Sequence, residues 1–400
     1  ALDEEDNQQG IAHYLEHMAF NGSKNFPAGT LVKEFESMGL TFGLHQNAFT
    51  GFDQTTYTIT MPNNDEENVS KALLCLSDFA YRLTLTETEV DRERKVILEE
   101  KRSRDGASQR VIEKLLPAML PGSRVAHRLP IGQVEVVNKV KSADFFRFYK
   151  KWYHPKNATL IVVGDVNVAK VHEMVSKHFK DWQSPQAVPQ HLPAKITPYT
   201  KQRSFVISDP ELTEVDISIV NVTPLEKWET EADFHRSLKG QLVSWIVNRR
   251  FKDLIDKGES HFQSASISKS SFLGVCSYAS MSAKSSPKKW RQAYADLVKE
   301  LKRVEQFGFT DREIEQAKKA VTSSAELSLQ QETNQLSDKI AESINDAVSD
   351  DSLPLSAKQD LELTKVYLKE VSLKDLQQTF LDSYQLSKSF VSLEFPEKVK

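Results

Sequence analysis

The sequence has few cysteines, no long apolar run and no strong excess of charge. Its 400 residues include only Cys75 and Cys276, which excludes a disulfide framework. Both lie in apolar stretches and are predicted to be small buried side chains. No apolar run approaches the roughly 18–20 residues that a membrane span needs. The 52 basic and 56 acidic residues leave a formal net charge of −4, which argues against nucleic-acid binding.

The composition is that of a globular protein with a sizeable core. Hydrophobic residues make up 39% and charged residues 27%, and the chain contains 21 phenylalanines. At roughly 150 residues per domain, the length predicts two or three domains. The chain starts at Ala1 without an initiator methionine or a signal sequence, so we expect a processed or cut polypeptide.

A proline-rich stretch divides the chain into two parts. Prolines occur four times in residues 183–200, with little periodicity, which predicts a linker. The parts on either side, residues 1–182 and 201–400, show a similar order of predicted elements. The sequence therefore predicts an α+β protein with two similar domains of about 200 residues, each an antiparallel-rich sheet packed with helices.

Apolar periodicity and turn residues predict the individual elements. The expected strands include a pair within residues 41–61, a buried strand at 158–163 and strands at 204–208, 215–222, 262–268 and 272–281. More helix is expected from residue 310 to the end. The main helices are predicted at residues 10–20, 28–38, 66–83, 87–103, 143–152, 229–257 and 288–307.

The most informative string is His13-Tyr14-Leu15-Glu16-His17. His13 and His17 are four residues apart, so on a helix both imidazoles project from one face and can bind one cation. Glu16 lies on the same face, where a carboxylate can accept a proton from water. Two imidazoles leave Zn²⁺ without a third protein ligand. The competing interpretation is a pair of ordinary surface or core histidines.

The helix that begins after Thr86 offers carboxylates for the third position. Its candidates are Glu93, Glu99 and Glu100. Glu93 and Glu100 are seven residues apart and share one face, whereas Glu99 points about 100° away from Glu100. One of them would ligate the metal while another braces a ligand histidine, and the spacing alone leaves the choice open. The simpler reading of this acidic helix is a solvated face.

Several stretches resemble the pitrilysin/insulinase family of zinc peptidases. The run from Gly10 to Ser23 is similar to the family's active-site helix with its inverted His-x-x-Glu-His motif. Asn47-Ala48-Phe49-Thr50 resembles its substrate-pairing edge strand, and Glu93-Arg94 through Glu100 resembles the segment that supplies the third ligand. Residues 129–132, 148–155 and 163–165 resemble the end of the family's first domain.

This resemblance implies one Zn²⁺ per chain and a role for each matching residue. His13, His17 and Glu100 would be the ligands and Glu16 the general base. Glu93 would be a carboxylate behind the ligands. A peptide substrate would add itself as a strand along Asn47, Ala48 and Phe49.

Two departures from the family imply that part of the machinery lies elsewhere. Only 12 residues precede His13, so the strand pair that normally opens the first domain is missing. Family members also complete the site with an Arg and a Tyr seven residues apart, and the nearest counterparts here are Ile255 and Phe262. We therefore expect a zinc-bearing half of a clamshell. The other half would be a missing C-terminal portion, a second copy of the chain or a partner subunit.

The resulting hypothesis is a zinc endopeptidase that cuts extended or unfolded peptides, with Glu16 as general base. The alternative is a non-catalytic scaffold subunit of the same fold, which would be free to lose the ligand residues. A third option is an unrelated metal hydrolase, although the edge-strand segment favours peptides. For a bacterial protein, the resemblance favours the periplasm or another exported location.

Overall fold

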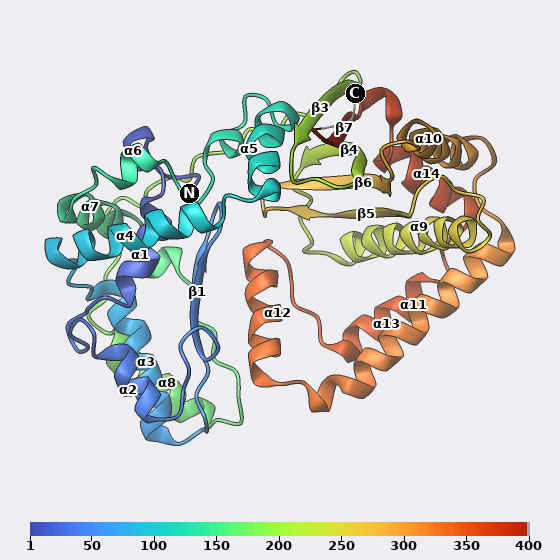
Figure 1. The fold of residues 1–400 in the computed structure, drawn as a ribbon. Helices are drawn as coiled ribbons and strands as arrows, with labels where there is room; N and C mark the ends of the chain where they lie inside the picture. Colours follow the sequence, from blue (N-terminus) through green and yellow to red (C-terminus); the bar gives the residue numbers. More distant parts are fainter. Residues whose placement is uncertain (398–400) are drawn as a thin grey trace. The chain divides into compact units, whose positions relative to one another are not determined.

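The computed structural model describes residues 1–397, and Figure 1 shows their helices and strands. The chain forms two compact units. Unit 1 comprises Ala1–Arg104, His127–Ala194 and Ser337–Glu342, and unit 2 comprises the other described residues. Residues 105–126 therefore group with unit 2, while the predicted domain limits at 182 and 201 stay a prediction. The mixed helix and sheet composition agrees with the predicted fold class.

Unit 1 is mainly helical and contains a two-stranded antiparallel sheet. Its helices at Ile11–Ala19 and Glu87–Ser103 confirm the two helices predicted to carry the candidate ligands. The Thr86 side chain caps the second of these by accepting from the Glu89 N–H. The elements of unit 1 are α1 (Ile11–Ala19), α2 (Leu31–Ser37), β1 (Gln46–Thr50), β2 (Thr55–Ile59), α3 (Glu66–Tyr81), α4 (Glu87–Ser103), α6 (Val134–Val137), α7 (Ser142–Trp152) and α8 (Val168–Phe179), with short 3-10 turns at Asp6–Gln8 and Pro155–Asn157.

The strand predicted at residues 158–163 was wrong. The segment runs without regular structure, and Leu160 and Val162 remain 38% and 40% exposed. Its β-branched residues favour a strand, but a strand forms only where a neighbouring chain segment satisfies its backbone groups. Within residues 1–397, no strand lies alongside this segment. The sheet of unit 1 is therefore limited to β1 and β2.

Helix α1 lies at the centre of the unit 1 core. Ile11, Tyr14, Leu15 and Met18 are all almost completely buried, and His17 is the only residue of α1 that is not buried. Each large apolar side chain buried in this way contributes about 1.5–3 kcal/mol. The Tyr14 hydroxyl also donates to the backbone carbonyl of a residue in α4. Packing therefore holds α1 in one position against α4.

The start of α1 is held by a buried carboxylate and a close backbone contact. Glu4 is fully buried and accepts from the N–H groups of Gly10 and Ala12, each at 2.9 Å. This caps the helix where its first N–H groups lack partners. Gly10 and Gly132 both have positive φ, and a Cβ on Gly132 would lie 2.4 Å from the Gly10 Cα. Only glycine fits there, so the first turn of α1 is tied to the loop before α6.

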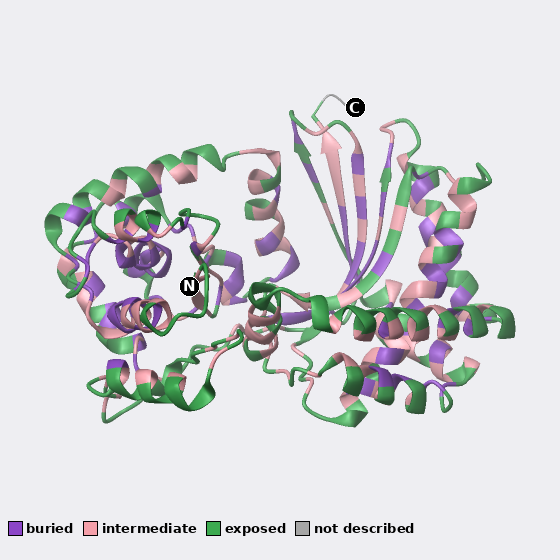
Figure 2. Cartoon of the chain, turned by 90° about the horizontal axis from the view of Figure 1, so that it is seen from below, coloured by how far each residue is buried: buried purple, intermediate pink, exposed green. Residues whose placement is uncertain are grey.

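Unit 2 contains a five-stranded sheet in the order β3-β7-β4-β6-β5. Only the β3–β7 pair is parallel, and the other pairs are antiparallel. Buried residues recur along its strands and on the packed helices, as the purple segments of Figure 2 show. The elements are α5 (Ala107–Met119), β3 (Arg203–Asp209), β4 (Val215–Pro224), α9 (Glu231–Asp256), β5 (Ser264–Phe272), β6 (Cys276–Ser285), α10 (Trp290–Phe307), α11 (Asp311–Gln331), α13 (Ala357–Tyr367), α14 (Leu373–Ser383) and β7 (Phe390–Pro396).

The sequence predicts helix from residue 310 to the end of the chain. This prediction is wrong for the last described segment. Helices α12 (Ser337–Ser349), α13 and α14 confirm most of that expectation, but Phe390–Pro396 forms strand β7. β7 lies between β3 and β4, so both its edges are paired. A strand inserted between two others depends on partners almost 200 residues away in the sequence, which a local pattern does not reveal.

Three helices of unit 2 meet at a buried arginine. Arg250 on α9 pairs with Glu300 on α10 at 2.8 Å and with Glu313 on α11 at 2.6 Å. Its guanidinium also donates to the Gly308 carbonyl at 3.1 Å. Arg250 and Glu300 are both buried. Hydrogen bonds to Arg250 and Thr310 lower the pKa of Glu313 to about 2, although burial opposes this shift. The cluster therefore joins α9, α10 and α11.

Ile255 and Phe262, the nearest counterparts of the family's Arg and Tyr, both lie in the apolar core of unit 2. Phe262 is buried and packs edge-on against Phe251, while Ile255 is partly buried against the same core. Neither side chain can donate a hydrogen bond. Within residues 1–397, no helix has the length and apolar character to cross a membrane.

We predict that Arg250→Ala destabilises unit 2 strongly. The substitution leaves the buried Glu300 carboxylate without its cation, which typically costs about 3–5 kcal/mol. The neighbouring Arg249 is exposed and pairs only with Asp253 on its own helix, so Arg249→Ala is the matched control. Thermal melts of the two variants and the parent chain test this. Equal melting temperatures for both variants would contradict the role assigned to Arg250.

Candidate metal centre

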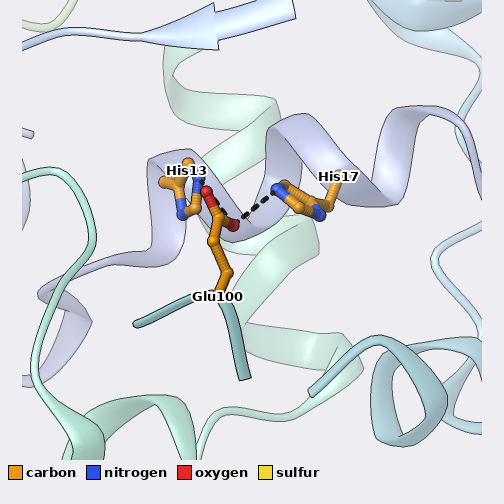
Figure 3. A group of neighbouring side chains, drawn as sticks. All are labelled: His13, His17 and Glu100. Atoms are coloured by element: carbon orange, nitrogen blue, oxygen red, sulfur yellow. Dashed lines mark ion pairs between the residues drawn. The ribbon is translucent and has the colours of Figure 1, made fainter. Parts of the chain in front are cut away.

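His13 and His17 lie one helical turn apart on α1 and face the same space. Their ring centroids are 4.8 Å apart, with an edge-on arrangement. Figure 3 shows both rings projecting from α1 toward the carboxylate of Glu100, which comes from α4. His13 is buried, and His17 is the more exposed of the two. The structure therefore brings together three residues that the sequence resemblance had combined.

The distances among these three residues suit a tetrahedral cation. The Oε2 atom of Glu100 lies 3.5 Å from His13 Nε2 and 3.3 Å from His17 Nε2. One nitrogen or oxygen of each residue lies within 4.8 Å of the others. Ligand bonds of 2.0–2.1 Å at tetrahedral angles place neighbouring ligand atoms about 3.3–3.4 Å apart. Two imidazoles and one carboxylate, with a fourth position left over, are also a donor set that zinc accepts in catalytic sites.

Glu93 holds the far side of the His17 ring. Its Oε1 lies 2.8 Å from His17 Nδ1, and its Oε2 accepts from the Asn21 side-chain amide at 2.7 Å. Because an ionised carboxylate only accepts, His17 Nδ1 carries the proton in this contact, and Nε2 is the nitrogen that faces Glu100 and can bind a metal once it has lost its own proton. This is the arrangement that fixes the tautomer and orientation of a ligand imidazole. Glu93 is thus placed to brace the ligand His17.

The charges around the two histidines are arranged to hold one cation. Burial and the neighbouring His17 lower the pKa of His13 to about 4. Burial lowers the pKa of His17 as well, but hydrogen bonds to Glu100 and Glu93 outweigh it and raise this pKa to about 9. The same contact with His17 lowers the pKa of Glu100, which also pairs with Arg104 on its other oxygen. Near pH 7 and without a metal, His13 is therefore neutral, Glu100 is ionised and His17 is protonated, so a bound cation takes the place of the His17 proton.

Glu16 lies on α1 beside the two histidines and is held by a threonine. It is buried, and its Oε2 accepts from the Thr50 hydroxyl at 2.5 Å. Burial raises the pKa of Glu16, and the hydrogen bond from Thr50 works in the opposite direction. A carboxylate with a raised pKa beside a metal site has the character of a general base.

The predicted substrate residues Asn47, Ala48 and Phe49 lie in β1, which pairs with β2 along one edge. The pairs His45–Thr60 and Gly51–Gln54 are joined by backbone hydrogen bonds. In an antiparallel ladder, such pairs alternate with pairs whose backbone groups point outward. The backbone groups of Ala48 and Thr50 therefore point to the edge of β1 opposite β2, where the Gln46 carbonyl accepts from the Gly43 N–H at 2.8 Å. Asn47 and Phe49 have exposed side chains, and Asn47 Oδ1 accepts the Ala48 N–H at 2.9 Å.

Sequence reasoning missed three contacts of the site. The resemblance places Thr50 only in the edge strand, and it assigns no role to Asn21 or Arg104. Alternation along β1 puts Thr50 on the same face as Ala48, but it does not reveal that this face meets Glu16. Asn21 follows the end of α1, and one further turn of helix would have placed it near His17. Arg104, four residues after Glu100, had a detectable i,i+4 signal.

Glu99 and the two cysteines agree with the simpler predictions, which are a solvent-exposed acidic side chain and small buried side chains. Glu99 is exposed and pairs with Arg102, so it does not compete for the metal. Cys75 and Cys276 are free and buried.

Comparison with known proteins gives matches along most of the chain. The sequence model of the insulinase family, peptidase family M16, matches residues 1–129. A second model, described as the M16 inactive domain, matches residues 139–321.

Relatives and solved structures agree with these matches. The probable zinc protease PqqL of Escherichia coli is 30% identical over 80% of this chain and 34% of that protein. Its namesake in Haemophilus influenzae is 27% identical over 99% of this chain and 43% of that protein. The solved first half of the periplasmic protease PqqL from Escherichia coli has a TM-score of 0.93 at 24% identity, covering 100% of this chain and 85% of that one. The chain thus spans less than half the length of the curated relatives it matches.

We predict a graded loss of zinc when the acidic residues of α4 are neutralised one at a time. Glu100→Gln removes a ligand and should reduce zinc affinity more than about 100-fold. Glu93→Gln removes the charge behind His17 and should reduce it about 10- to 100-fold. Glu99→Gln is the matched control, because Glu99 neighbours Glu100 but is exposed. Elemental analysis and chelator competition on each purified variant give the order, and similar loss from Glu99→Gln would reject this ligand assignment.

Proposed function

Because the chain belongs to the insulinase family of peptidases, family M16, we propose that it is the zinc-bearing half of a metalloendopeptidase. Its substrates are extended or unfolded peptides. The observation that carries the proposal is the group formed by His13, His17 and Glu100, with Glu16 beside it. A protease family alone does not establish activity, but this group contains the residue types needed to hold the metal and to take a proton from water.

His13, His17 and Glu100 hold the zinc in this proposal. When bound, zinc polarises the scissile carbonyl and lowers the pKa of water toward about 7. Glu93 keeps the His17 ring in the tautomer that leaves Nε2 free, and Asn21 in turn holds Glu93. The buried position of His13 limits the access of bulk water to the site from one side.

Glu16 acts as the general base. Its Oε2 is engaged by Thr50, whereas within residues 1–397 no hydrogen bond reaches Oε1, which is therefore available to accept a proton from the attacking water. Glu16 then passes this proton to the leaving amine, so the peptide bond is cleaved and one water is consumed. No covalent intermediate with the protein is needed.

The edge of β1 opposite β2 binds the substrate. An extended peptide pairs with the outward backbone groups of Ala48 and displaces the Asn47 side chain from the Ala48 N–H, while Phe49 borders the same edge. Backbone pairing recognises the extended conformation rather than particular side chains. This favours unfolded segments as substrates.

A non-catalytic scaffold is the second candidate. The match of residues 139–321 to an inactive M16 domain concerns the part of the chain that lacks the zinc ligands. Residues 1–129 match the other model and retain His13, Glu16, His17 and Glu100. This complete set favours the peptidase.

The remainder of the active site is supplied by a second clamshell half. The chain covers 44% of the solved full-length periplasmic protease PqqL, at 25% identity. The second half is a further portion of the same polypeptide, a second copy or a partner subunit. The same relative is called periplasmic, and we propose a periplasmic or otherwise exported location for this protein too.

Glu16→Gln is predicted to keep zinc and to lose turnover. Glutamine has the same shape and can still accept from Thr50, but it cannot take up the proton, so the rate should fall about 10²- to 10⁴-fold. Cleavage of a fluorogenic unstructured peptide measures the rate, and elemental analysis measures zinc. Glu36→Gln, a neutralised exposed acid on α2, is the control. A Glu16→Gln protein that turns over at the parental rate would remove Glu16 from the mechanism.

The need for a second half gives a separate prediction. Light scattering during size-exclusion chromatography reports the native mass, and each fraction is assayed for peptidase activity. We expect no activity in a fraction at the monomer mass of 45.4 kDa and activity only in a larger assembly or a longer native product. An active species at the monomer mass would show that the chain completes its own site.

A further inference from the structure

Glu16 is the end of a row of hydroxyl groups within unit 1. Thr50 Oγ1 lies 2.5 Å from Glu16 Oε2 and 3.3 Å from Thr55 Oγ1. The Tyr153 hydroxyl interacts with the Thr55 side chain and lies 2.8 Å from the Tyr57 hydroxyl. These residues come from β1, from β2 and from the loop after α7. We call them the hydroxyl row: Thr50, Thr55, Tyr153 and Tyr57.

The chemistry of the groups gives the row one direction. An ionised carboxylate only accepts hydrogen bonds, so the Thr50 hydroxyl donates to Glu16 and has its oxygen free to accept from Thr55. Thr55 can accept in the same way from Tyr153, and Tyr153 from Tyr57. Burial raises the pKa of Tyr153 to about 12, against the hydrogen bonds of Tyr57 and Thr55, so this hydroxyl keeps its proton near neutral pH.

Rigid packing supports the far end of the row. The Tyr57 ring contacts Phe79 with centroids 5.2 Å apart and lies 6.4 Å from Phe20. The Tyr153 ring lies 4.9 Å from that of Tyr149, whose hydroxyl donates to the Phe79 carbonyl at 2.8 Å. Side chains fixed by packing hold the hydroxyls in place without relying on the metal site.

We propose that Thr50, supported by Thr55 and Tyr153, is a positioning residue that orients the Glu16 carboxylate for proton transfer. This inference rests on the proposed function, because it assigns Thr50 a part in the reaction that Glu16 carries out. Thr50 touches neither the candidate ligands nor, through its side chain, the exposed face of β1. Its effect is exerted through Glu16 Oε2.

A glutamate needs such support at this position. Its side chain has three rotatable bonds, and ordering it costs up to about 2 kcal/mol. A general base acts only within hydrogen-bond reach of the proton that it removes. The hydrogen bond from Thr50 to the charged Glu16 carboxylate offsets this entropic cost. It also determines that Oε2 is the Glu16 oxygen that faces β1. Since β1 is also the proposed substrate edge, the same strand positions both the peptide and the base.

The test compares Thr50→Val, which removes the hydroxyl with little change of shape, with Thr50→Ser, which keeps it. We expect Thr50→Val to lower kcat about 10- to 100-fold, with KM and zinc content unchanged, and Thr50→Ser to restore most of the rate. Thr55→Val and Tyr153→Phe should have progressively smaller effects. Thr60→Val is the matched control, since alternation puts Thr60 on the opposite face from Thr55 and Tyr57.

Crystal structures of the metal-free parent chain, Thr50→Val and Thr50→Ser provide a readout that does not depend on activity. We expect Glu16 to leave its position in Thr50→Val and to keep it in Thr50→Ser. An unmoved Glu16 in Thr50→Val, or a valine variant with parental kcat, would overturn the inference. If the parent protein shows no peptidase activity even in a larger assembly or a longer native product, the proposed function fails, and the Glu16 positions in the crystals still decide whether Thr50 orients it.

Discussion

The packing of α1 against α4 is the constraint on which the candidate site depends. Glu93 and Glu100 are seven residues, or about 10.5 Å, apart along α4, and the His17 ring lies between them. One carboxylate contacts Nδ1 of this ring and the other contacts Nε2. Both helices are anchored in one core through residues such as Tyr14 and Ile97. The packing of the two helices therefore fixes the backbone positions from which these side chains reach the site.

The charges of the site follow from this packing. Three carboxylates, those of Glu16, Glu93 and Glu100, lie around two imidazoles, and Arg104 offsets part of the negative charge at the solvent side. The raised pKa of His17 shows that the surroundings stabilise a positive charge at this point. A divalent cation satisfies the same need more fully than a single proton does. Burial of His13 keeps that imidazole neutral and ready to bind.

The two-stranded sheet of unit 1 connects Glu16 to the proposed substrate edge. The edge of β1 opposite β2 bears the residues proposed to bind a peptide, while the face of β1 that carries Thr50 touches Glu16. In the proposed function, one strand would therefore position both the base and the peptide. Unit 2 has a larger sheet and its own buried ion cluster around Arg250, and nothing in its described residues forms a second group of metal-binding side chains.

The sequence alone determined what depends on local backbone geometry. The 3.6-residue period placed His13, Glu16 and His17 on one face, and the Thr86 cap located the start of α4. The spacing did not choose among Glu93, Glu99 and Glu100. That choice came from the family resemblance, and the structure shows why: Glu99 turns to solvent while the other two face α1. The contact of Thr50 with Glu16, the strand at Phe390–Pro396 and the missing strand at 158–163 were decided by tertiary structure, because each depends on whether a distant segment packs alongside.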